Sequence, residues 1–259
     1  MKEKILVCQV QPDMVWEDIG ANLDLLNKML YDLPEGTDLV LFPETFSTGF
    51  SMQSEANAEA VNGRAVSWMK EIANLKKITV SGSVIIRDDD QIYNRLYWIS
   101  PGGISGQYDK RHLFRMGQEN ENFKAGISRE IFTLGQFRFL PQICYDLRFP
   151  VFSRNQGDYD VVYYVANWPA PRQPVWETLV RARAIENQAY ALAVNRVGID
   201  GMGVNHLGGT CAIDPVGKVI QRMGDKPGIQ SVTIDLQMLR NFRRKFPVWK
   251  DADRFDIEL

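Results

Sequence analysis

The chain has 259 residues, of which 45% are hydrophobic, and its formal net charge at pH 7 is -2. This length lies near the top of the single-domain range, so we interpret residues 1–259 as one domain with a substantial apolar core. The nearly balanced charge gives no electrostatic reason to expect nucleic acid or a membrane surface as a partner.

The apolar runs and the cysteines indicate the compartment. The run from Ile5 to Cys8 is interrupted by Gln9, so it is too short for a secretory signal. No other run approaches the roughly 18 residues of a membrane span. Cys8, Cys144 and Cys211 are odd in number and widely spaced, which argues against a disulfide framework. We therefore expect a cytoplasmic protein.

Strand-like apolar runs alternate with amphipathic patterns along the chain, without a repeat or a low-complexity tract, which favours mixed α and β structure. The expected strands are 4–10, 39–42, 79–86, 91–100, 161–165 and 189–195. The expected helices are 19–33, 66–73 and 175–187. Turn signals predict antiparallel pairing over 79–110 and a hairpin over 211–221.

Three strand-like segments are followed by side chains that could perform chemistry. Cys144 ends an apolar run and opens a polar turn, Glu44 follows the run 39–42, and Lys110 follows a strand-like segment. A nucleophilic cysteine needs a base and a cation beside it. Each residue also has a structural interpretation, as a buried thiol, a surface carboxylate or a solvated basic turn. An unpaired carboxylate at the end of a buried strand is nevertheless disfavoured.

The segments around these residues carry a family resemblance. LFPE at 41–44, YDKRHLF at 108–114 and ICYDLRFP at 143–150 resemble the Glu-Lys-Cys motifs of the nitrilase superfamily of carbon-nitrogen hydrolases. The resemblance covers nearly the whole chain. ANWPAPR at 166–172 and RARAIENQAY at 181–190 are similar to the omega-amidase branch in particular. The resemblance implies an α/β fold of the four-layer α-β-β-α sandwich type.

The resemblance also implies amide hydrolysis through a thioester. Cys144 is then the nucleophile, Glu44 is the general base, and Lys110 with the backbone N–H of Tyr145 stabilises the oxyanion. Members of the superfamily usually carry a second acid between the lysine and the cysteine. Glu119 matches its place. Neighbouring Glu121 remains an alternative, and a solvated acidic loop explains either residue without catalysis.

Omega-amidase similarity implies 2-oxo-dicarboxylate monoamides, such as 2-oxoglutaramate and 2-oxosuccinamate, as substrates. Arg148 or Arg172 could hold the substrate carboxylate, because the guanidinium fork donates two parallel hydrogen bonds. A structural ion pair is the alternative for Arg148. The aromatic residues that could form pocket walls, or simply core, are Phe46, Phe114, Tyr145 and Trp168. The other functions considered are a nitrilase, an N-carbamoyl amino acid hydrolase and a non-catalytic binding module.

No cofactor or metal site is expected. The chain has two histidines, His112 and His206, without a paired ligand motif, and the glycines of 198–209 lack the order of a phosphate-binding loop. We interpret that segment as a mobile loop near the site. Asp146 is expected to pair with a neighbouring base. The resemblance implies a homodimer or a higher homo-oligomer, with the tail 246–259 at the contact.

Overall fold

The computed structural model describes residues 2–258, and its framework is two β-sheets. The first sheet has the order β15 (Gly228–Asp235), β1 (Lys4–Gln11), β2 (Thr37–Leu41), β4 (Thr79–Asp88), β5 (Gln91–Ser100) and β6 (Gly103–Asp109), with β3 (Glu59–Ala60) beside β4. The second has the order β14 (Val219–Arg222), β13 (Cys211–Ile213), β10 (Tyr190–Val194), β9 (Val161–Val165), β8 (Phe137–Ile143) and β7 (Phe132–Leu134).

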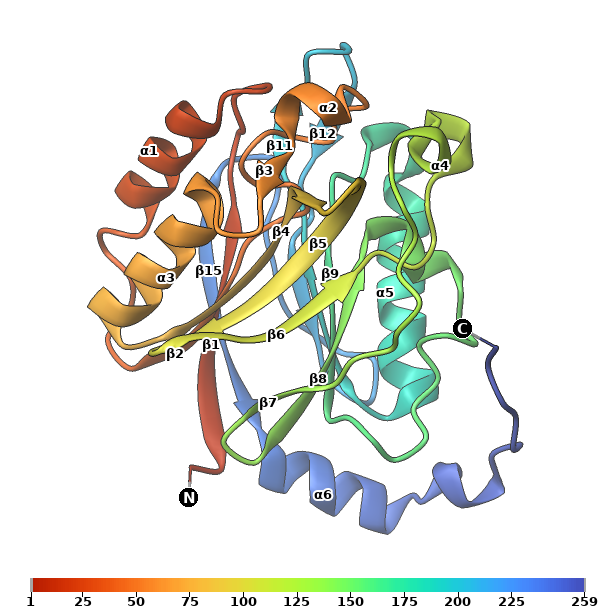
Figure 1. Cartoon of the computed structure of the whole chain (residues 1–259). Coiled ribbons are helices and arrows are strands. Elements are labelled where there is room, and N and C mark those ends of the chain that lie inside the picture. The colour runs from red at the N-terminus through yellow and green to blue at the C-terminus, as the bar shows by residue number, and fades with distance from the viewer. Residues whose placement is uncertain (1, 259) are drawn as a thin grey trace.

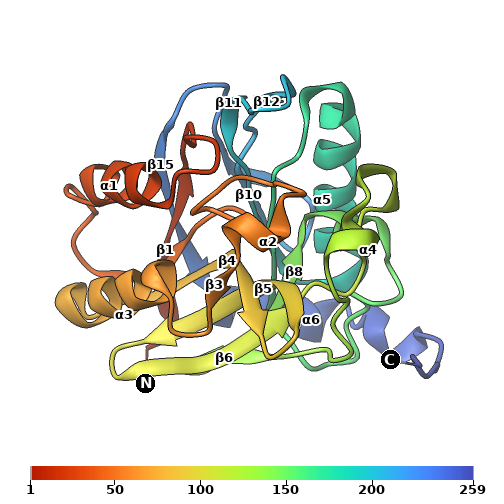
Figure 2. The same ribbon diagram turned by 45° about the horizontal axis from the view of Figure 1, so that its top comes forward.

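Helices cover the outer face of each sheet. The α-helices are α1 (Ile19–Met29), α2 (Ser54–Asn57), α3 (Arg64–Lys76), α4 (Glu119–Asn122), α5 (Gln173–Asn187) and α6 (Leu236–Lys245). Figures 1 and 2 show α1 and α3 on the side of the first sheet and α5 on the side of the second. Four 3₁₀ turns complete the description: η1 (Arg115–Gly117), η2 (Cys144–Arg148), η3 (Ala170–Arg172) and η4 (Val248–Asp251).

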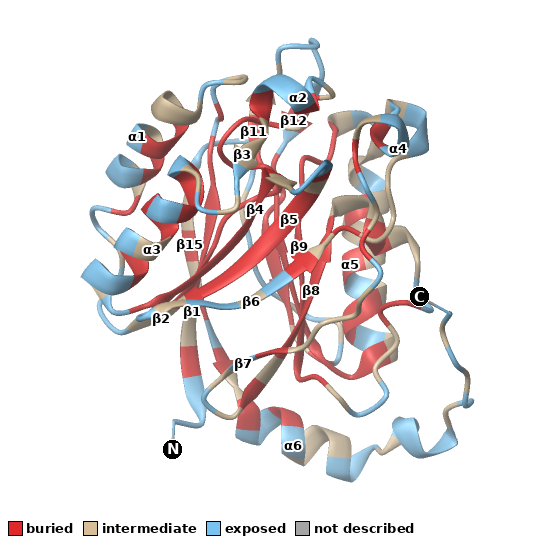
Figure 3. Ribbon diagram, in the orientation of Figure 1, coloured by how far each residue is buried: buried red, intermediate tan, exposed pale blue. Residues whose placement is uncertain are grey.

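Three apolar clusters separate these layers. One lies between α1, α3 and the first sheet, one between the two sheets, and one between the second sheet and α5. Burial is accordingly densest along the central strands (Figure 3). This arrangement confirms the expected α-β-β-α sandwich. Among the helices of residues 2–258, none is both long enough and apolar enough to cross a bilayer.

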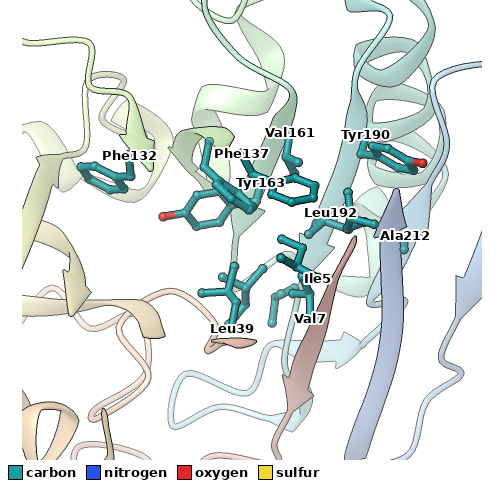
Figure 4. Packing of buried hydrophobic residues seen from close by; sticks show 14 of the residues in the cluster. Ile5, Val7, Leu39, Phe132, Phe137, Val161, Tyr163, Tyr190, Leu192 and Ala212 are labelled. Carbon is teal, nitrogen blue, oxygen red and sulfur yellow. The ribbon is translucent and has the colours of Figure 1, made fainter. Parts of the chain in front are cut away.

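Strand β1 shows how the sequence pattern produces the layers. Ile5 and Val7 lie in the cluster between the two sheets, whereas Cys8 and Val10 lie in the cluster under α1 and α3. Successive side chains of a strand point to opposite faces, so a strand that is apolar on both faces belongs between two layers. Figure 4 shows Ile5 and Val7 packed near Leu192 of the opposite sheet.

Strand direction determines where the polar strand ends meet. Strands β1, β2 and β4 are parallel, and β6 runs the same way because it is antiparallel to β5, which is antiparallel to β4. In the second sheet β8, β9 and β10 are parallel. The carboxyl ends of parallel strands lie at one edge of a sheet. In Figure 1 this edge is toward the top, near α4.

Two expectations about local structure are wrong. Helix α1 ends at Met29, although the apolar spacing continues to Leu33, because Leu30 and Leu33 pack against the core from the following turns. The segment 198–209, which was expected to be a mobile loop, instead contributes to the hairpin of β11 (Val197–Ile199) and β12 (Asn205–Leu207). The side chain of Asp200 accepts hydrogen bonds from two backbone N–H groups of its turn.

Candidate active site

Glu44 lies just beyond the carboxyl end of β2 and is completely buried. Its Oε1 accepts hydrogen bonds from Lys110 Nζ at 2.8 Å and Asn94 Nδ2 at 2.9 Å. Its Oε2 accepts one from the backbone N–H of Asn167 at 2.9 Å. A buried carboxylate is tolerated when it is paired and hydrogen-bonded in this way.

Lys110 follows β6 and lies between two carboxylates. Its Nζ donates to Glu44 Oε1 at 2.8 Å and to Glu119 Oε1 at 2.9 Å. Burial alone would lower the pKa of Lys110, but the charges of Glu119 and Glu44 outweigh burial and raise this pKa well above its ordinary value. The ammonium therefore stays charged throughout the neutral range.

Glu119 is the first residue of α4 and is also completely buried. Its Oε2 accepts a hydrogen bond from the backbone N–H of Phe114 at 2.6 Å, which fixes the carboxylate against Lys110. Burial raises the pKa of Glu119, although the charge of Lys110 opposes the shift. Glu121, the alternative for the second acid, is exposed. Geometry therefore places Glu119 rather than Glu121 beside the lysine.

Cys144 follows β8 and opens η2 with a positive φ of 44°. This conformation is uncommon for a residue with a Cβ, and the surrounding structure has to hold it. Asp146 does so: it accepts hydrogen bonds from the backbone of Ile143 at 2.9 Å and from the hydroxyl of Tyr108 at 2.8 Å. Asp146 also contacts His112 Nδ1 at 2.7 Å, which is the pairing with a base expected from the sequence.

The environment of Cys144 favours the protonated thiol. Burial and the negative charge of Glu44 raise the pKa of Cys144 well above its ordinary value, and Lys110 only partly opposes them. The charge of Glu44 thus acts on the thiol, and the arrangement favours a protonated thiol with a carboxylate available as proton acceptor over a preformed thiolate.

The thiol opens into a cavity of about 690 Å³, which Lys110 and Cys144 both line. Aromatic residues form much of its wall, among them Phe50, Phe114, Tyr145 and Trp168. Phe46, which was also expected as a wall, does not line the cavity. It is completely buried and packs against Phe42 and Trp68, because its side chain points toward the helical layer.

Two arginines line the same cavity. The guanidinium of Arg148 lies 5.4 Å from the ring centroid of Trp168, and that of Arg172 lies 5.1 Å from the ring centroid of Phe114. Within residues 2–258, neither arginine forms an ion pair with a carboxylate. The structural ion pair considered for Arg148 is thus not formed among those residues, and both cations face a cavity that could take an anion.

The sequence interpretation missed three polar residues at this edge. Asn94 of β5 donates to Glu44 and, at 3.3 Å, to Glu119, so it bridges the two carboxylates. Asn167 holds Glu44 through its backbone N–H and also donates from Nδ2 to the backbone carbonyl of Glu44 at 2.6 Å. His206 lines the cavity from β12. No signal in the sequence set Asn94 apart, because the same strand also carries Gln91 and Arg95.

The fold and this cluster agree with the comparisons to known proteins. A model of the carbon-nitrogen hydrolase family matches residues 4–244, so the chain belongs to that family and is a carbon-nitrogen hydrolase. It is 44% identical over 250 residues to the omega-amidase YafV of Escherichia coli (strain K12), covering 96% of each chain. These findings confirm the resemblance to the nitrilase superfamily and to its omega-amidases.

Two further relatives extend the comparison. The chain is 34% identical over 219 residues to a 2-oxoglutaramate amidase of Bacillus subtilis (strain 168), covering 83% of this chain and 84% of the other. The crystal structure of XC1258 from Xanthomonas campestris, a CN-hydrolase superfamily protein with an arsenic adduct in its active site, matches with a TM-score of 0.96. Identity to XC1258 is 38%, over 99% of this chain and 100% of that one. Together these relatives support amidohydrolase activity.

Proposed function

We propose that this protein hydrolyses the terminal amide of small 2-oxo-dicarboxylate monoamides, such as 2-oxoglutaramate and 2-oxosuccinamate, to the acid and ammonia. The observation that carries the proposal is the buried cluster in which Lys110 Nζ lies between Glu44 and Glu119 beside the Cys144 thiol. Similarity to an omega-amidase and to a 2-oxoglutaramate amidase supports this class of substrate.

The first half-reaction forms a thioester. Glu44 accepts the thiol proton as Cys144 Sγ attacks the amide carbon, which avoids a free thiolate whose formation the raised pKa of Cys144 disfavours. The Lys110 ammonium and the backbone N–H of Tyr145 meet the negative charge that develops on the carbonyl oxygen. Glu44 then returns the proton to the leaving nitrogen, and ammonia departs.

The second half-reaction hydrolyses the thioester. Glu44 accepts a proton from water as the water oxygen attacks the acyl carbon, and the proton returns to the Cys144 sulfur when the acid leaves. Glu119 takes no proton in this scheme. It orients Lys110, since it is itself fixed by the backbone N–H of Phe114. One carboxylate thus alternates between base and acid while the other keeps the cation in place.

Arg148 and Arg172 are the proposed partners of the substrate carboxylate. Both line the cavity with no carboxylate partner among the described residues, and each guanidinium lies over an aromatic ring of the wall, Trp168 or Phe114. Stacking limits the freedom of a guanidinium plane, so less entropy is lost when its N–H groups bind a carboxylate.

Ammonia release from 2-oxoglutaramate tests the proposed function. Glutamine, a simple nitrile and an N-carbamoyl amino acid serve as the comparison substrates, and Cys144→Ala as the inactive variant. The proposal predicts fastest turnover of the oxo-amide and loss of that turnover in Cys144→Ala. Faster turnover of the nitrile or of the carbamoyl compound would assign a different hydrolase, and a folded protein inactive on all four would favour a binding module.

Three further expectations stay proposals: residues 1–259 form one domain, the protein is cytoplasmic, and it forms a homodimer or a higher homo-oligomer with the tail 246–259 at the contact. Exposed Phe246 and Trp249 in that tail support the dimer, since large exposed apolar side chains often mark a contact. The free cysteines Cys8 and Cys211, both buried, agree with a reducing compartment. Light scattering of the full chain and of Trp249→Glu would test the dimer.

A further inference from the structure

His206 is the buried residue of strand β12. Its neighbours Asn205 and Leu207 are exposed, whereas His206 has 4% of its surface exposed and lines the cavity that holds Cys144. The alternation of the strand therefore directs one titratable side chain of the β11–β12 hairpin toward the active site. None of the steps described above uses this imidazole.

The protein leaves part of the hydrogen-bonding capacity of this imidazole unused. Its Nδ1 is buried and has no hydrogen-bond partner among the residues that the structure describes. Buried polar atoms in native proteins are nearly always paired, and an unpaired one destabilises the fold. The unpaired Nδ1 is accounted for when a ligand in that cavity supplies the missing partner.

The surroundings of His206 favour an anionic ligand. Arg196 is completely buried. Burial of the His206 side chain lowers its pKa most, the charge of Arg196 lowers it further, and these two effects outweigh the opposite effect of Asp200. The imidazole is therefore neutral near pH 7 and can donate one hydrogen bond and accept another. The nearest carboxylate to Arg196 is that of Asp13, at 3.6 Å from Nη2, and the Nη1 of Arg196 has no partner in the described part of the chain.

The hairpin is fixed to the wall of the active site. Asn195 Nδ2 donates to the backbone carbonyls of Gly208 at 2.8 Å and Trp168 at 3.0 Å, and its Oδ1 accepts from the N–H of Trp168 at 2.8 Å. One side chain thus joins the base of the hairpin to the aromatic wall. A contact made from β12 is consequently held at a constant position relative to Cys144, as a specificity residue requires.

We propose that His206 is a substrate-binding residue that sets specificity, by hydrogen-bonding the 2-oxo acid end of the substrate while the buried charge of Arg196 favours an anion there. This inference rests on the proposed function, because it assigns the partner of one end of the same substrate. The ligand group is an oxygen of the carboxylate or of the 2-oxo group, and the two are distinguished by the choice of amides.

The test compares kcat and KM for three amides: 2-oxoglutaramate, glutaramate, which lacks the oxo group, and butyramide, which lacks both oxygen functions. His206→Phe removes the hydrogen bonds but keeps a ring, and His206→Gln keeps donor and acceptor atoms. Asn205→Ala changes the exposed neighbour on the same strand and serves as the control. Butyramide turnover by each variant reports whether the catalytic cluster is intact.

The proposal predicts that His206→Phe lowers kcat/KM for 2-oxoglutaramate by about tenfold or more, mainly through KM, and leaves butyramide within about twofold. His206→Gln should recover part of the loss. An equal loss for glutaramate assigns the contact to the carboxylate, and a loss confined to 2-oxoglutaramate assigns it to the oxo group.

Two results would overturn the inference. If the wild type prefers 2-oxoglutaramate and His206→Phe keeps that preference, the proposed function stands and the role of His206 falls. If the wild type hydrolyses butyramide as well as 2-oxoglutaramate, the proposed function falls and the assignment of His206 falls with it. The substrate preference of the wild type thus tests the proposed function, and the ratio of variant to wild-type kcat/KM tests the role of His206.

Discussion

Lys110 donates a hydrogen bond from Nζ to Oε1 of Glu44 over 2.8 Å, and both side chains are shielded from solvent. Removing one member of a buried ion pair leaves an uncompensated charge, which commonly costs about 3–5 kcal/mol. Activity lost on replacing either residue therefore has to be separated from lost stability. Isosteric substitutions, with stability measured alongside rates, are the suitable probes of this site.

Cys144→Ala should abolish amide turnover and leave the fold intact. The substitution removes the sulfur and keeps a Cβ at the same positive φ, so it adds no new backbone strain. Rates of ammonia release and thermal unfolding of the variant measure the two effects. Appreciable turnover in a folded Cys144→Ala protein would exclude Cys144 as the nucleophile.

Glu44→Gln should slow turnover by about a thousandfold while making the thiol more acidic. The negative charge of Glu44 raises the pKa of Cys144, so its removal shifts thiolate formation to lower pH. The rate of iodoacetamide alkylation against pH measures this shift. Wild type should react appreciably only at alkaline pH, and the variant should react at lower pH.

Cys144→Ala is the control for this alkylation, since Cys8 and Cys211 are buried and should stay unlabelled. An alkylation profile that is unchanged in Glu44→Gln, or moved to higher pH, would contradict the electrostatic account of the thiol. If Glu44→Gln accumulated the thioester at the normal acylation rate, Glu44 would be needed only for hydrolysis of the thioester by water.

Glu119→Gln and Glu121→Gln form a matched pair within one acidic segment. Glu119 is buried against Lys110, so its neutral amide should lower kcat by about 100-fold or more through a misplaced ammonium. Glu121 is exposed, and its variant should remain within about twofold of wild type. Steady-state kinetics of the two proteins decide between them, and equal losses would exclude the role assigned to Glu119.

Arg148→Gln and Arg172→Gln should each weaken binding of an anionic amide. A lost charge-assisted hydrogen bond to a carboxylate is worth about 1.5–3 kcal/mol, which corresponds to a rise in KM of about tenfold or more for 2-oxoglutaramate. Butyramide has no carboxylate, so its kcat/KM should change little. If both variants leave KM for 2-oxoglutaramate unchanged, the substrate carboxylate binds elsewhere.

Asp146→Ala should lower the free energy of unfolding by about 3 kcal/mol or more. Its carboxylate accepts hydrogen bonds from Tyr108, from Ile143 and, over 3.0 Å, from the N–H of His112, and the variant would leave these donors unpaired. Urea unfolding measures the change, with Asp90→Ala at an exposed turn as the control. A loss no greater than that of the control would show that this network does not hold the Cys144 turn.

The three strand ends could be predicted because they have local signals. Periodicity predicted only mixed α and β structure, and the sandwich was implied by the family resemblance. Apolar runs followed by Glu44, Lys110 and Cys144 could be recognised residue by residue, and the family resemblance related them to one another. The choice between Glu119 and Glu121 had no such signal, since both lie in the same acidic segment. Burial separated them: Glu119 faces Lys110, and Glu121 faces solvent.

The sequence by itself determined most of the long strands and helices and the family that the chain resembles, because hydrophobic periodicity and contiguous motifs are local properties. The tertiary structure decided which distant side chains share one cavity. Asn94 reaches Glu44 from β5, and His206 reaches the cavity from β12, through packing between elements far apart in the chain. Such contacts depend on strand register and layer packing, which no local pattern of residues encodes.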